Sequence, residues 1–435
     1  MTGRYKAYPE YKLSNNFELG YIPSHWGTSK VRYVSYCLDG RRIPLNGTER
    51  GEMQGSVPYW GANSVVDHIN EYIFDEDLVL LGEDGAPFFD TTKNVAFFVQ
   101  GKVWPNNHVH VLRPEGSKVN AKFLTYALNC VDYHLYITGS TRDKLNQSAM
   151  NDIALRICSL EEQQKIANFL DFETAKIDTL IAKQEKLIEL LKEKRQALIS
   201  HAVTKGLNAQ VPMKDSGVEW LGAVPEHWQI VPLKYLCTFS GGGTPTKDNL
   251  SYWTNGTVPW VSPKDMKSFW IDKTQDNVTE RAIKESSTNI VDEGALLMVV
   301  RSGILQRTIP IAINTVPVTM NQDMKALKFN DRIDVQYAAG FILGSVDSLL
   351  LDWSKDGATV ESIEYEYLAN GLFPVPPKQE QQAIISFINK QQSTFQTLED
   401  KALVGIKLLS ERRTALISAA VTGKIDVRNL EQPND

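Results

Sequence analysis

The 435-residue sequence has few cysteines, no long apolar run and no excess of positive charge. Its four cysteines lie far apart, without a Cys-x-x-Cys or Cys/His cluster, which excludes the common structural zinc motifs and predicts reduced thiols. The N-terminus lacks an apolar signal region, and the longest apolar run, residues 295–300, is too short to span a bilayer. We therefore expect a soluble, cytoplasmic protein without membrane contact.

Motifs of the common nucleotide-using and hydrolytic enzymes are also missing. The sequence has no Walker A loop, His-Glu-x-x-His, Gly-x-Ser-x-Gly or dinucleotide fingerprint, and no Asn/Asp-Pro-Pro-Tyr/Phe tetrapeptide of an amino-methyltransferase. His25 and His227 each precede a tryptophan and are interpreted as structural. We expect no catalytic residue, metal or cofactor in this chain. The net charge of −6 means that any contact with phosphate must come from local patches.

The sequence does contain an internal repeat. Residues 12–34 align without gaps on residues 214–236, at an offset of 202, and both segments carry Leu-Gly-x-x-Pro-x-His-Trp. Residues 139–204 align on residues 357–422, at an offset of 218, with 22 of 66 positions identical. The middles of the two copies do not align. Two copies of one unit with different middles predict one kind of task performed on two different targets.

Each copy is predicted to form an α+β globular part followed by one long helix. Short apolar runs bounded by Gly, Asn and Pro predict strands at residues 77–81, 94–99, 108–112, 295–300 and 309–313. Residues 119–130 and 334–350 are predicted to be helices. The long helices are expected at 159–206, which opens with a capping box at Ser159 and ends at Gly206, and at 378–422.

Apolar residues recur along both long helices in alternating steps of four and three, which is typical of a coiled coil. The predicted seam consists of Ile166, Leu170, Ile177, Leu180, Leu187, Leu191, Leu198, Ile384, Ile388, Phe395, Leu398, Leu409 and Leu416. We expect the two helices to pair antiparallel within the chain. This gives a near-circular molecule with a pseudo-two-fold axis, in which the tail after residue 422 and residues 1–12 complete one half. The alternatives are that each helix packs on its own globular part or on another subunit.

Polar and basic residues in the loops are the candidates for contacting a nucleic acid, because Arg reads guanine, Asn and Gln read adenine, and Lys holds phosphate. In the first copy these are Arg41, Arg42, Lys93, Asn106, Asn107, His108, Arg142 and Lys144. In the second copy they are Thr244, Lys247, Lys264, Lys267, Arg301, Ser302, Arg307, Asn321 and Gln322. The repeat supports two of these positions in particular, since Asn106-Asn107 aligns with Asn321-Gln322 ahead of a predicted strand in each copy.

These motifs together resemble the DNA specificity subunit of type I restriction–modification systems. The resemblance covers nearly the whole chain and is carried by the repeated Leu-Gly-x-x-Pro-x-His-Trp, by Gly242-Gly243-Thr244-Pro245, and by Arg301-Ser302-Gly303. Its strongest marker is Pro-Pro-x-x-Glu-Gln-Gln-x-Ile at residues 376–384, which leads into a helix ending Arg-Arg-Thr-Ala-Leu-Ile-Ser at 412–418. The first copy departs from the pattern at residues 40–44 and 157–159.

The resemblance implies two target recognition domains, at 1–158 and 207–377, with spacer helices at 159–206 and 378–422 and a tail at 423–435. Each domain would read one half of a split sequence in double-stranded DNA, and the helical pair would set the spacing between the halves. Two methyltransferase subunits would dock largely along the helices and use S-adenosylmethionine to methylate an adenine in each half. With a translocating restriction subunit added, the assembly would cleave unmethylated DNA.

Two other functions are compatible with part of the sequence. A DNA-free scaffold would carry two ligand-binding domains on a coiled-coil rod and gather other proteins. A standalone enzyme with an unfamiliar site is disfavoured by the missing motifs. Binding to random duplex pools distinguishes the first alternative, and a methyl-transfer assay of the isolated chain tests the second.

Overall fold

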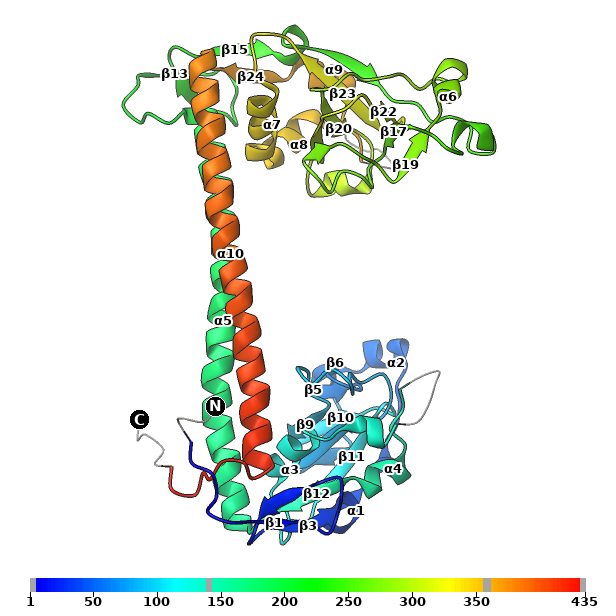
Figure 1. Ribbon diagram of the computed structural model, residues 1–435, viewed down its shortest axis with the longest axis vertical. Helices are drawn as coiled ribbons and strands as arrows, with labels where there is room; N and C mark the ends of the chain where they lie inside the picture. Colours follow the sequence, from blue (N-terminus) through cyan, green and yellow to red (C-terminus); the bar gives the residue numbers. More distant parts are fainter. Residues whose placement is uncertain (1–4, 138–142, 355–360, 431–435) are drawn as a thin grey trace. The chain divides into compact units, whose positions relative to one another are not determined.

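The computed structural model describes residues 5–137, 143–354 and 361–430. The chain divides into two compact units, residues 1–186 with 402–435 (unit 1) and residues 187–401 (unit 2). Each unit contains one α+β domain together with a part of both long helices (Figure 1). This matches the predicted class of two mixed domains joined by two long helices.

Unit 1 has an antiparallel sheet of order β4-β11-β8-β9 and a second sheet of order β6-β5-β10-β7, in which β5 and β10 are parallel. Helix α3 (Ala121–Leu128) packs against β8 and β9. The strands of the two sheets are β4 (Ser35–Cys37), β5 (Gln54–Trp60), β6 (Val65–Ile69), β7 (Phe74–Asp75), β8 (Leu78–Gly82), β9 (Ala96–Val99), β10 (Lys102–Pro105) and β11 (Val109–Pro114). The remaining helices are α1 (Val31–Val34), η1 (Asp39–Arg41), α2 (Gly47–Glu52), η2 (Tyr133–Leu135) and α4 (Gln147–Asp152).

Unit 2 repeats this plan with a five-stranded sheet of order β16-β23-β20-β21-β18 and a three-stranded sheet of order β19-β17-β22. The strands are β16 (Cys237–Gly241), β17 (Val258–Val261), β18 (Trp270–Ile271), β19 (Asp276–Val278), β20 (Leu296–Val299), β21 (Ile311–Asn314), β22 (Thr319–Met320) and β23 (Met324–Phe329). The helices are η3 (Leu233–Tyr235), η4 (Leu250–Tyr252), α6 (Glu280–Glu285), η5 (Gly303–Gln306), α7 (Val335–Gly344), α8 (Val346–Trp353) and α9 (Tyr365–Asn370). The five predicted apolar strands are thus confirmed as β8, β9, β11, β20 and β21, while the helix predicted at 334–350 is divided at Ser345 into α7 and α8.

The parts of the sequence that repeat form equivalent small sheets in the two units. The strands concerned are β1 (Tyr11–Leu13), β2 (Tyr21–Pro23), β3 (Gly27–Lys30), β12 (Ala154–Ile157), β13 (Met213–Asp215), β14 (Ala223–Pro225), β15 (Gln229–Pro232) and β24 (Leu372–Val375). The hairpin pair Lys12↔Ile22 corresponds to Lys214↔Val224, and the pair Ile157↔Gly27 corresponds to Val375↔Gln229. Each copy therefore closes on itself, with its last strand paired to a strand near its start.

Behind each hairpin, the histidine and tryptophan of the repeated motif join the domain to a long helix. Trp26 and Trp228 are fully buried. His25 Nε2 lies 2.9 Å from Glu162 Oε2, and His227 Nε2 lies 2.7 Å from the equivalent Glu380. The two histidines thus attach the hairpins to the first turns of the long helices, in agreement with a structural role.

The Glu-Gln-Gln motif places a fully buried glutamine at the start of each long helix. Gln163 accepts a hydrogen bond from the Asn120 N–H at 2.8 Å and donates to backbone carbonyls at both Lys118 and Cys158. Gln381 makes the same three bonds with Asp334, Arg332 and Pro376. Because buried polar groups require partners, this one side chain joins two backbone segments through three backbone groups in each copy.

The long helices α5 (Leu160–Lys205) and α10 (Lys378–Val421) are antiparallel in each unit. In unit 1 the Arg413 Nε lies 2.9 Å from Asp178, and Gln184 packs on Gly405. In unit 2 Arg195 lies 3.2 Å from Glu399. The predicted antiparallel pairing is therefore confirmed, and α5 ends at Gly206, whose φ of +77° is the left-handed conformation of a helix C-terminus.

Three residues of the predicted seam do not lie in it. Leu180, Leu187 and Leu398 are exposed at 47, 43 and 42%. Beyond Ile177 the less exposed positions of α5 are those at 181, 184, 188, 191, 195 and 198, so two steps of four follow one another at Ile177. The same double step occurs in α10 at the equivalent Phe395, where Glu399 is buried in place of Leu398. Such a stutter shifts every second seam position by one residue. The sequence prediction assumed strictly alternating steps of four and three and therefore misplaced these positions.

Unit 1 contains both ends of the described chain. The Asp426 N–H donates to the Lys6 carbonyl at 2.7 Å, and the Tyr11 hydroxyl donates to the Gly423 carbonyl at 2.9 Å. Tyr8 is buried beneath Arg428, whose guanidinium lies 5.0 Å from the ring centre. The tail and the N-terminal segment thus complete unit 1, as expected from the repeat.

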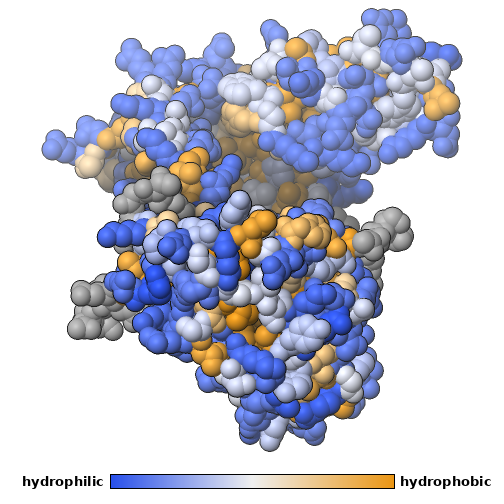
Figure 2. Space-filling view, turned by 60° about the horizontal axis from the view of Figure 1, so that its bottom comes forward, coloured by the Kyte–Doolittle hydropathy of each residue, from blue (hydrophilic) through white to orange (hydrophobic). Residues whose placement is uncertain are grey.

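Among the described residues, no helix has the length and apolar character needed to cross a membrane. Hydrophilic residues cover most of the face shown in Figure 2, with apolar residues in small groups between them.

Candidate nucleic-acid interface

An asparagine turn occupies the same place in both domains. It follows β10 in unit 1 and β22 in unit 2, and the N–H groups of Asn106 and Asn321 donate to Trp60 and Val261 at 3.0 Å each. Both side-chain oxygens accept a backbone N–H two residues further on. Asn106 and Asn321 are only 9 and 7% exposed, so their side chains shape the turn, and base contact by them stays an untested prediction. The adjacent Asn107 and Gln322 are exposed.

In unit 2 the glycine-rich loop lies directly on this turn. The Gly243 N–H donates to the Met320 carbonyl at 2.8 Å, and the Thr244 hydroxyl is hydrogen-bonded to Gln322. A Cβ on Gly242 would lie 1.9 Å from the Asn321 carbonyl oxygen, so only glycine fits this approach. The loop is therefore a packing element that brings Thr244 and Gln322 together, which explains why the motif needs its glycines.

Arg301 lies at the same turn. Its Nε is 2.9 Å from Asp323 Oδ1, and its side chain is 60% exposed. Ser302 N-caps η5, its side chain accepting from the Ile304 N–H, and has a local structural role. At this turn Thr244 thus contacts Gln322, and Arg301 contacts Asp323. Asp323 was missed in the sequence, although it lies two positions beyond the repeated asparagine.

The corresponding loop of unit 1 is built differently. The Arg42 side chain is only 14% exposed, lies 2.6 Å from Glu83 and donates to the Val109 carbonyl at 2.7 Å. Asp39 lies beside it; burial raises the pKa of this carboxyl, but hydrogen bonds from His110 and the Val111 N–H outweigh burial and hold the pKa below its usual value. Arg42 therefore has a structural role in this loop, and its contact with DNA stays a prediction.

Asp39, Glu83 and His110 have ligand atoms within 4.8 Å of one another, the spacing of a metal site. Both nitrogens of His110 already have partners, Asp39 at 2.6 Å and the Leu145 carbonyl at 2.8 Å. Arg42 balances the carboxylates. The cluster is thus satisfied as a charge network that fixes the loop.

The other candidates of unit 1 lie at the surface. The Arg41 guanidinium stacks over Phe74 at 4.5 Å, and Lys93 is 65% exposed. His108 pairs with Asp84 and is 42% exposed, while Lys144 is 52% exposed and lies 3.1 Å from Glu83. Arg142 lies outside the described residues.

The lysines of unit 2 divide between two surfaces. Lys247 follows the glycine-rich loop and Lys264 follows β17, and both are exposed. Lys267 and Arg307, in contrast, line a hollow beside the long helices. The candidate residues of unit 2 therefore form more than one surface.

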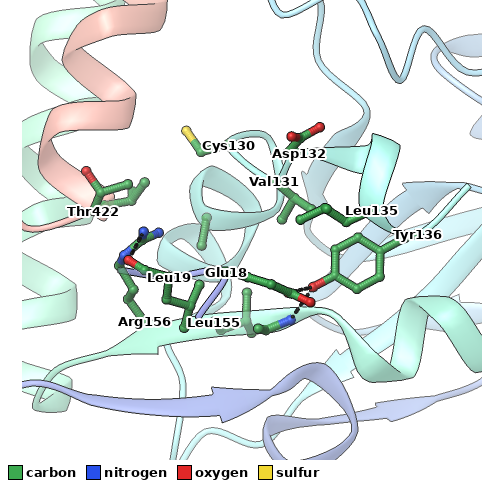
Figure 3. A pocket seen from close by; sticks show the side chains of 13 residues that line it. Glu18, Leu19, Cys130, Val131, Asp132, Leu135, Tyr136, Leu155, Arg156 and Thr422 are labelled. Atoms are coloured by element: carbon green, nitrogen blue, oxygen red, sulfur yellow. Dashed lines mark hydrogen bonds between the residues drawn. The ribbon is translucent and has the colours of Figure 1, made fainter. Parts of the chain in front are cut away.

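A pocket in unit 1 is small and lined partly by hydrogen-bonded groups. Its volume of about 180 Å³ is below the roughly 300–1,000 Å³ of typical ligand sites. As Figure 3 shows, its polar groups bond to one another: the Tyr136 hydroxyl donates to Glu18 at 2.5 Å, and Arg156 donates to the Leu19 carbonyl at 2.5 Å. Burial raises the pKa of the adjacent Cys130 thiol to about 12, which disfavours a reactive thiolate. These bonds attach the first hairpin to the domain.

The architecture agrees with comparisons to known proteins. Residues 23–190 and 225–407 match the family model described as "Type I restriction modification DNA specificity domain". The chain belongs to this family.

Relatives support the same assignment. The "Type I restriction enzyme EcoR124I/EcoR124II specificity subunit" of Escherichia coli is 33% identical over 250 residues, 57% of this chain and 55% of that protein. The "Type I restriction enzyme MjaVIII specificity subunit" of Methanocaldococcus jannaschii is 21% identical over 94% of this chain and 95% of its own length. The first curated relatives are thus matched over about half of their length or less, at 55, 36 and 39%.

Solved structures share the fold. The HsdS subunit from Thermoanaerobacter tengcongensis aligns with a TM-score of 0.53 at 13% identity, covering 93% of this chain and 98% of that one. A chain from a structure titled as the "complex assembly" and "conformational transition of the type I R-M system" aligns with a TM-score of 0.67 at 13% identity, covering 92 and 98%. At this identity the likeness concerns the fold alone.

Proposed function

We propose that this chain is the specificity subunit of a type I restriction–modification complex, with its target recognition domains at residues 1–158 and 207–377. Each domain binds one half of a bipartite sequence in double-stranded DNA, and the helical pair sets the spacing between the halves. One observation supports this most strongly. The two domains present the same asparagine turn, but half-buried Thr244 and exposed Gln322 and Arg301 lie at it in unit 2, whereas a half-buried, ion-paired Arg42 lies beside it in unit 1. One framework with two different sets of side chains suits two different half-sites.

In this proposal the chain performs no chemistry itself. Two methyltransferase subunits bind S-adenosylmethionine and transfer its methyl group to adenine, and a translocating restriction subunit adds cleavage. The complex acts in the cytoplasm, where the DNA is. The test is selection of bound duplexes from a random library by the chain together with its methyltransferase subunits. A split consensus of two unlike halves is expected. Absence of DNA binding would favour the scaffold alternative, and methyl transfer by the isolated chain would favour an enzyme.

Base contact by Gln322 gives a specific prediction. Replacing Gln322 with Ala should relax the selected consensus at one position of one half-site, because losing a side chain that reads a base costs about 1–3 kcal/mol, roughly 10- to 100-fold in discrimination. Asn107→Ala, at the equivalent exposed position of unit 1, is the matched control and should relax only the other half. Library selection with each variant measures both effects. An unchanged consensus for Gln322→Ala would contradict the assignment.

Exposed leucines on the long helices are candidates for docking the two methyltransferase subunits. Leu180 and Leu398 are repeat equivalents at the offset of 218, as are Leu190 and Leu408, and all four are 42–59% exposed. Each unit contains one member of each pair. Two copies of one partner require the same contact residues twice, and these apolar pairs meet that requirement.

Leu180→Asp combined with Leu398→Asp should release both methyltransferase subunits, since a buried carboxylate in an apolar contact costs about 2 kcal/mol or more, roughly thirtyfold in Kd for each subunit. Either single variant should release one subunit. Native mass spectrometry measures the stoichiometry. Glu193→Ala with Glu411→Ala, an exposed polar pair at the same offset, serves as control and should keep both subunits. Full assembly of the double leucine variant would contradict this docking site.

A further inference from the structure

Each unit has a hollow between its domain and the long helices, and the two hollows use equivalent positions of the repeat. In unit 2 the helices contribute Arg195, Asn389 and Gln396, and the domain contributes Lys267 and Arg307 together with residues of α7 and α8. In unit 1 the helices contribute Asp171, Asp178 and Arg413, and α3 contributes Lys122. At the offset of 218, Asp171 aligns with Asn389, Asp178 with Gln396, and Arg195 with Arg413. The two hollows are therefore lined by the same helix positions of the repeat.

Their charges differ. In unit 1 the Lys122 Nζ lies 2.6 Å from Asp171, and the Arg413 Nε lies 2.9 Å from Asp178, so the two cations are both neutralised. In unit 2 the repeat replaces both aspartates with amides. Arg195 still pairs with the buried Glu399 at 3.2 Å, but Lys267 and Arg307 are exposed and have no ion pair within the described part of the chain.

The amides change the hydrogen-bonding character as well as the charge. An aspartate can only accept hydrogen bonds and repels an anion, whereas Asn389 and Gln396 each carry an NH2 group that donates. Gln396 gives one N–H to Asp400 at 2.9 Å and retains a second. The lining of this hollow includes the unpaired cations Lys267 and Arg307 and one carboxylate, that of Asp347. The unit 2 hollow thus combines the exposed cations Lys267 and Arg307 with neutral donors, the groups that contact phosphate.

We propose that the hollow of unit 2 binds the sugar–phosphate backbone of DNA through Lys267 and Arg307, with Asn389 and Gln396 as neutral donors, and that the equivalent hollow of unit 1 does not. This rests on the proposed DNA-binding function and adds an asymmetry to it. Unit 2 therefore makes more phosphate contacts than unit 1, and electrostatic attraction contributes more to the binding free energy of its half-site. These contacts carry no sequence information, because every nucleotide presents the same phosphate.

The test uses the full chain with its methyltransferase subunits and measures Kd against KCl concentration, on the selected target duplex and on a random duplex. Lys267→Gln with Arg307→Gln should lower the slope of log K against log salt by about 1.8, since each lost phosphate contact removes about 0.9. Affinity should fall by the same factor on both duplexes. Lys284→Gln with Lys328→Gln, exposed lysines of unit 2 outside the hollow, is the charge-matched control and should leave the slope unchanged.

Exchanging the repeat-equivalent residues tests the asymmetry in both directions. Asn389→Asp with Gln396→Asp should weaken binding on both duplexes, whereas Asp171→Asn with Asp178→Gln should free Lys122 and Arg413, tighten binding and steepen the slope. The second exchange keeps the test valid if the first variant fails to assemble. If the Lys267/Arg307 variant and both exchange variants keep the wild-type slope and Kd, phosphate binding by the unit 2 hollow is wrong, but DNA recognition by the complex is unaffected. A wild-type complex that binds no duplex would overturn the proposed function, and the hollow with it.

Discussion

Inserting one heptad into both long helices should abolish methylation of the original target and create activity on a target with a longer spacer. The change is seven residues after Lys186 in α5 and seven after Lys401 in α10, which keeps the seam in register. Seven residues add roughly 10.5 Å of helix at 1.5 Å per residue, about three base-pair rises of 3.4 Å. We expect at least a hundredfold preference for the target lengthened by three base pairs, because the original spacing leaves one domain without its half-site.

The measurement is methylation of a set of duplexes that hold both half-sites constant and vary the spacer by single base pairs. Insertion into α5 alone is the informative control, because it leaves the two helices unequal and should reduce assembly instead of shifting the optimum. A normally assembled complex with both insertions that still prefers the original spacer would show that the helices do not set the distance.

Replacing the buried Gln381 with Leu should destabilise unit 2 by about 2–4 kcal/mol. The side chain of Gln381 satisfies the Asp334 N–H and the carbonyls of Arg332 and Pro376, at 2.7, 3.0 and 2.8 Å. Leucine has a similar volume but leaves these buried backbone groups without partners, at roughly 1–3 kcal/mol each before relaxation.

Urea unfolding of the full chain measures the effect as a lower midpoint of the transition that reports on unit 2. Gln382→Leu is a close control, since Gln382 is the next residue in the same motif but is exposed, and its change should stay within about 0.5 kcal/mol. Gln163→Leu should have the equivalent effect on unit 1. Equal midpoints for Gln381→Leu and Gln382→Leu would contradict the role assigned to the buried glutamine.

Much of the fold was predictable because its signals are local or repeated. The long helices follow from apolar periodicity without proline, interrupted in the second helix by Gly405 alone, and their antiparallel pairing follows from the repeat. The seam was predicted less well, because Leu180 and Leu398 fit the four–three spacing and yet face outward. An apolar side chain predicts burial in an interface but does not say in which one. The stutter at Ile177 and Phe395 depends on how the two helices pack against each other. The residues at issue therefore became candidates for partner docking.

The candidate site was predicted only in outline. The repeat located the turn at Asn106 and Asn321, but it could not show that the first asparagine of each turn is buried while its neighbour is exposed. The signal for the buried Gln163 and Gln381 was present in the repeated Glu-Gln-Gln, although two of the three backbone partners of each glutamine lie more than 40 residues away along the chain.

The sequence by itself determined that this chain is a duplicated unit with two long helices and unlike middles, because periodicity and self-similarity are properties of neighbouring residues and aligned segments. Tertiary structure alone decided which charged side chains are free to meet a ligand. Arg42 and Arg301 are the same residue type in the sequence, but contacts with the distant Glu83 and Val109 leave the Arg42 side chain only 14% exposed, while that of Arg301 remains 60% exposed. Desolvation and ion pairing depend on residues that only folding brings together, and so does the difference between the two hollows.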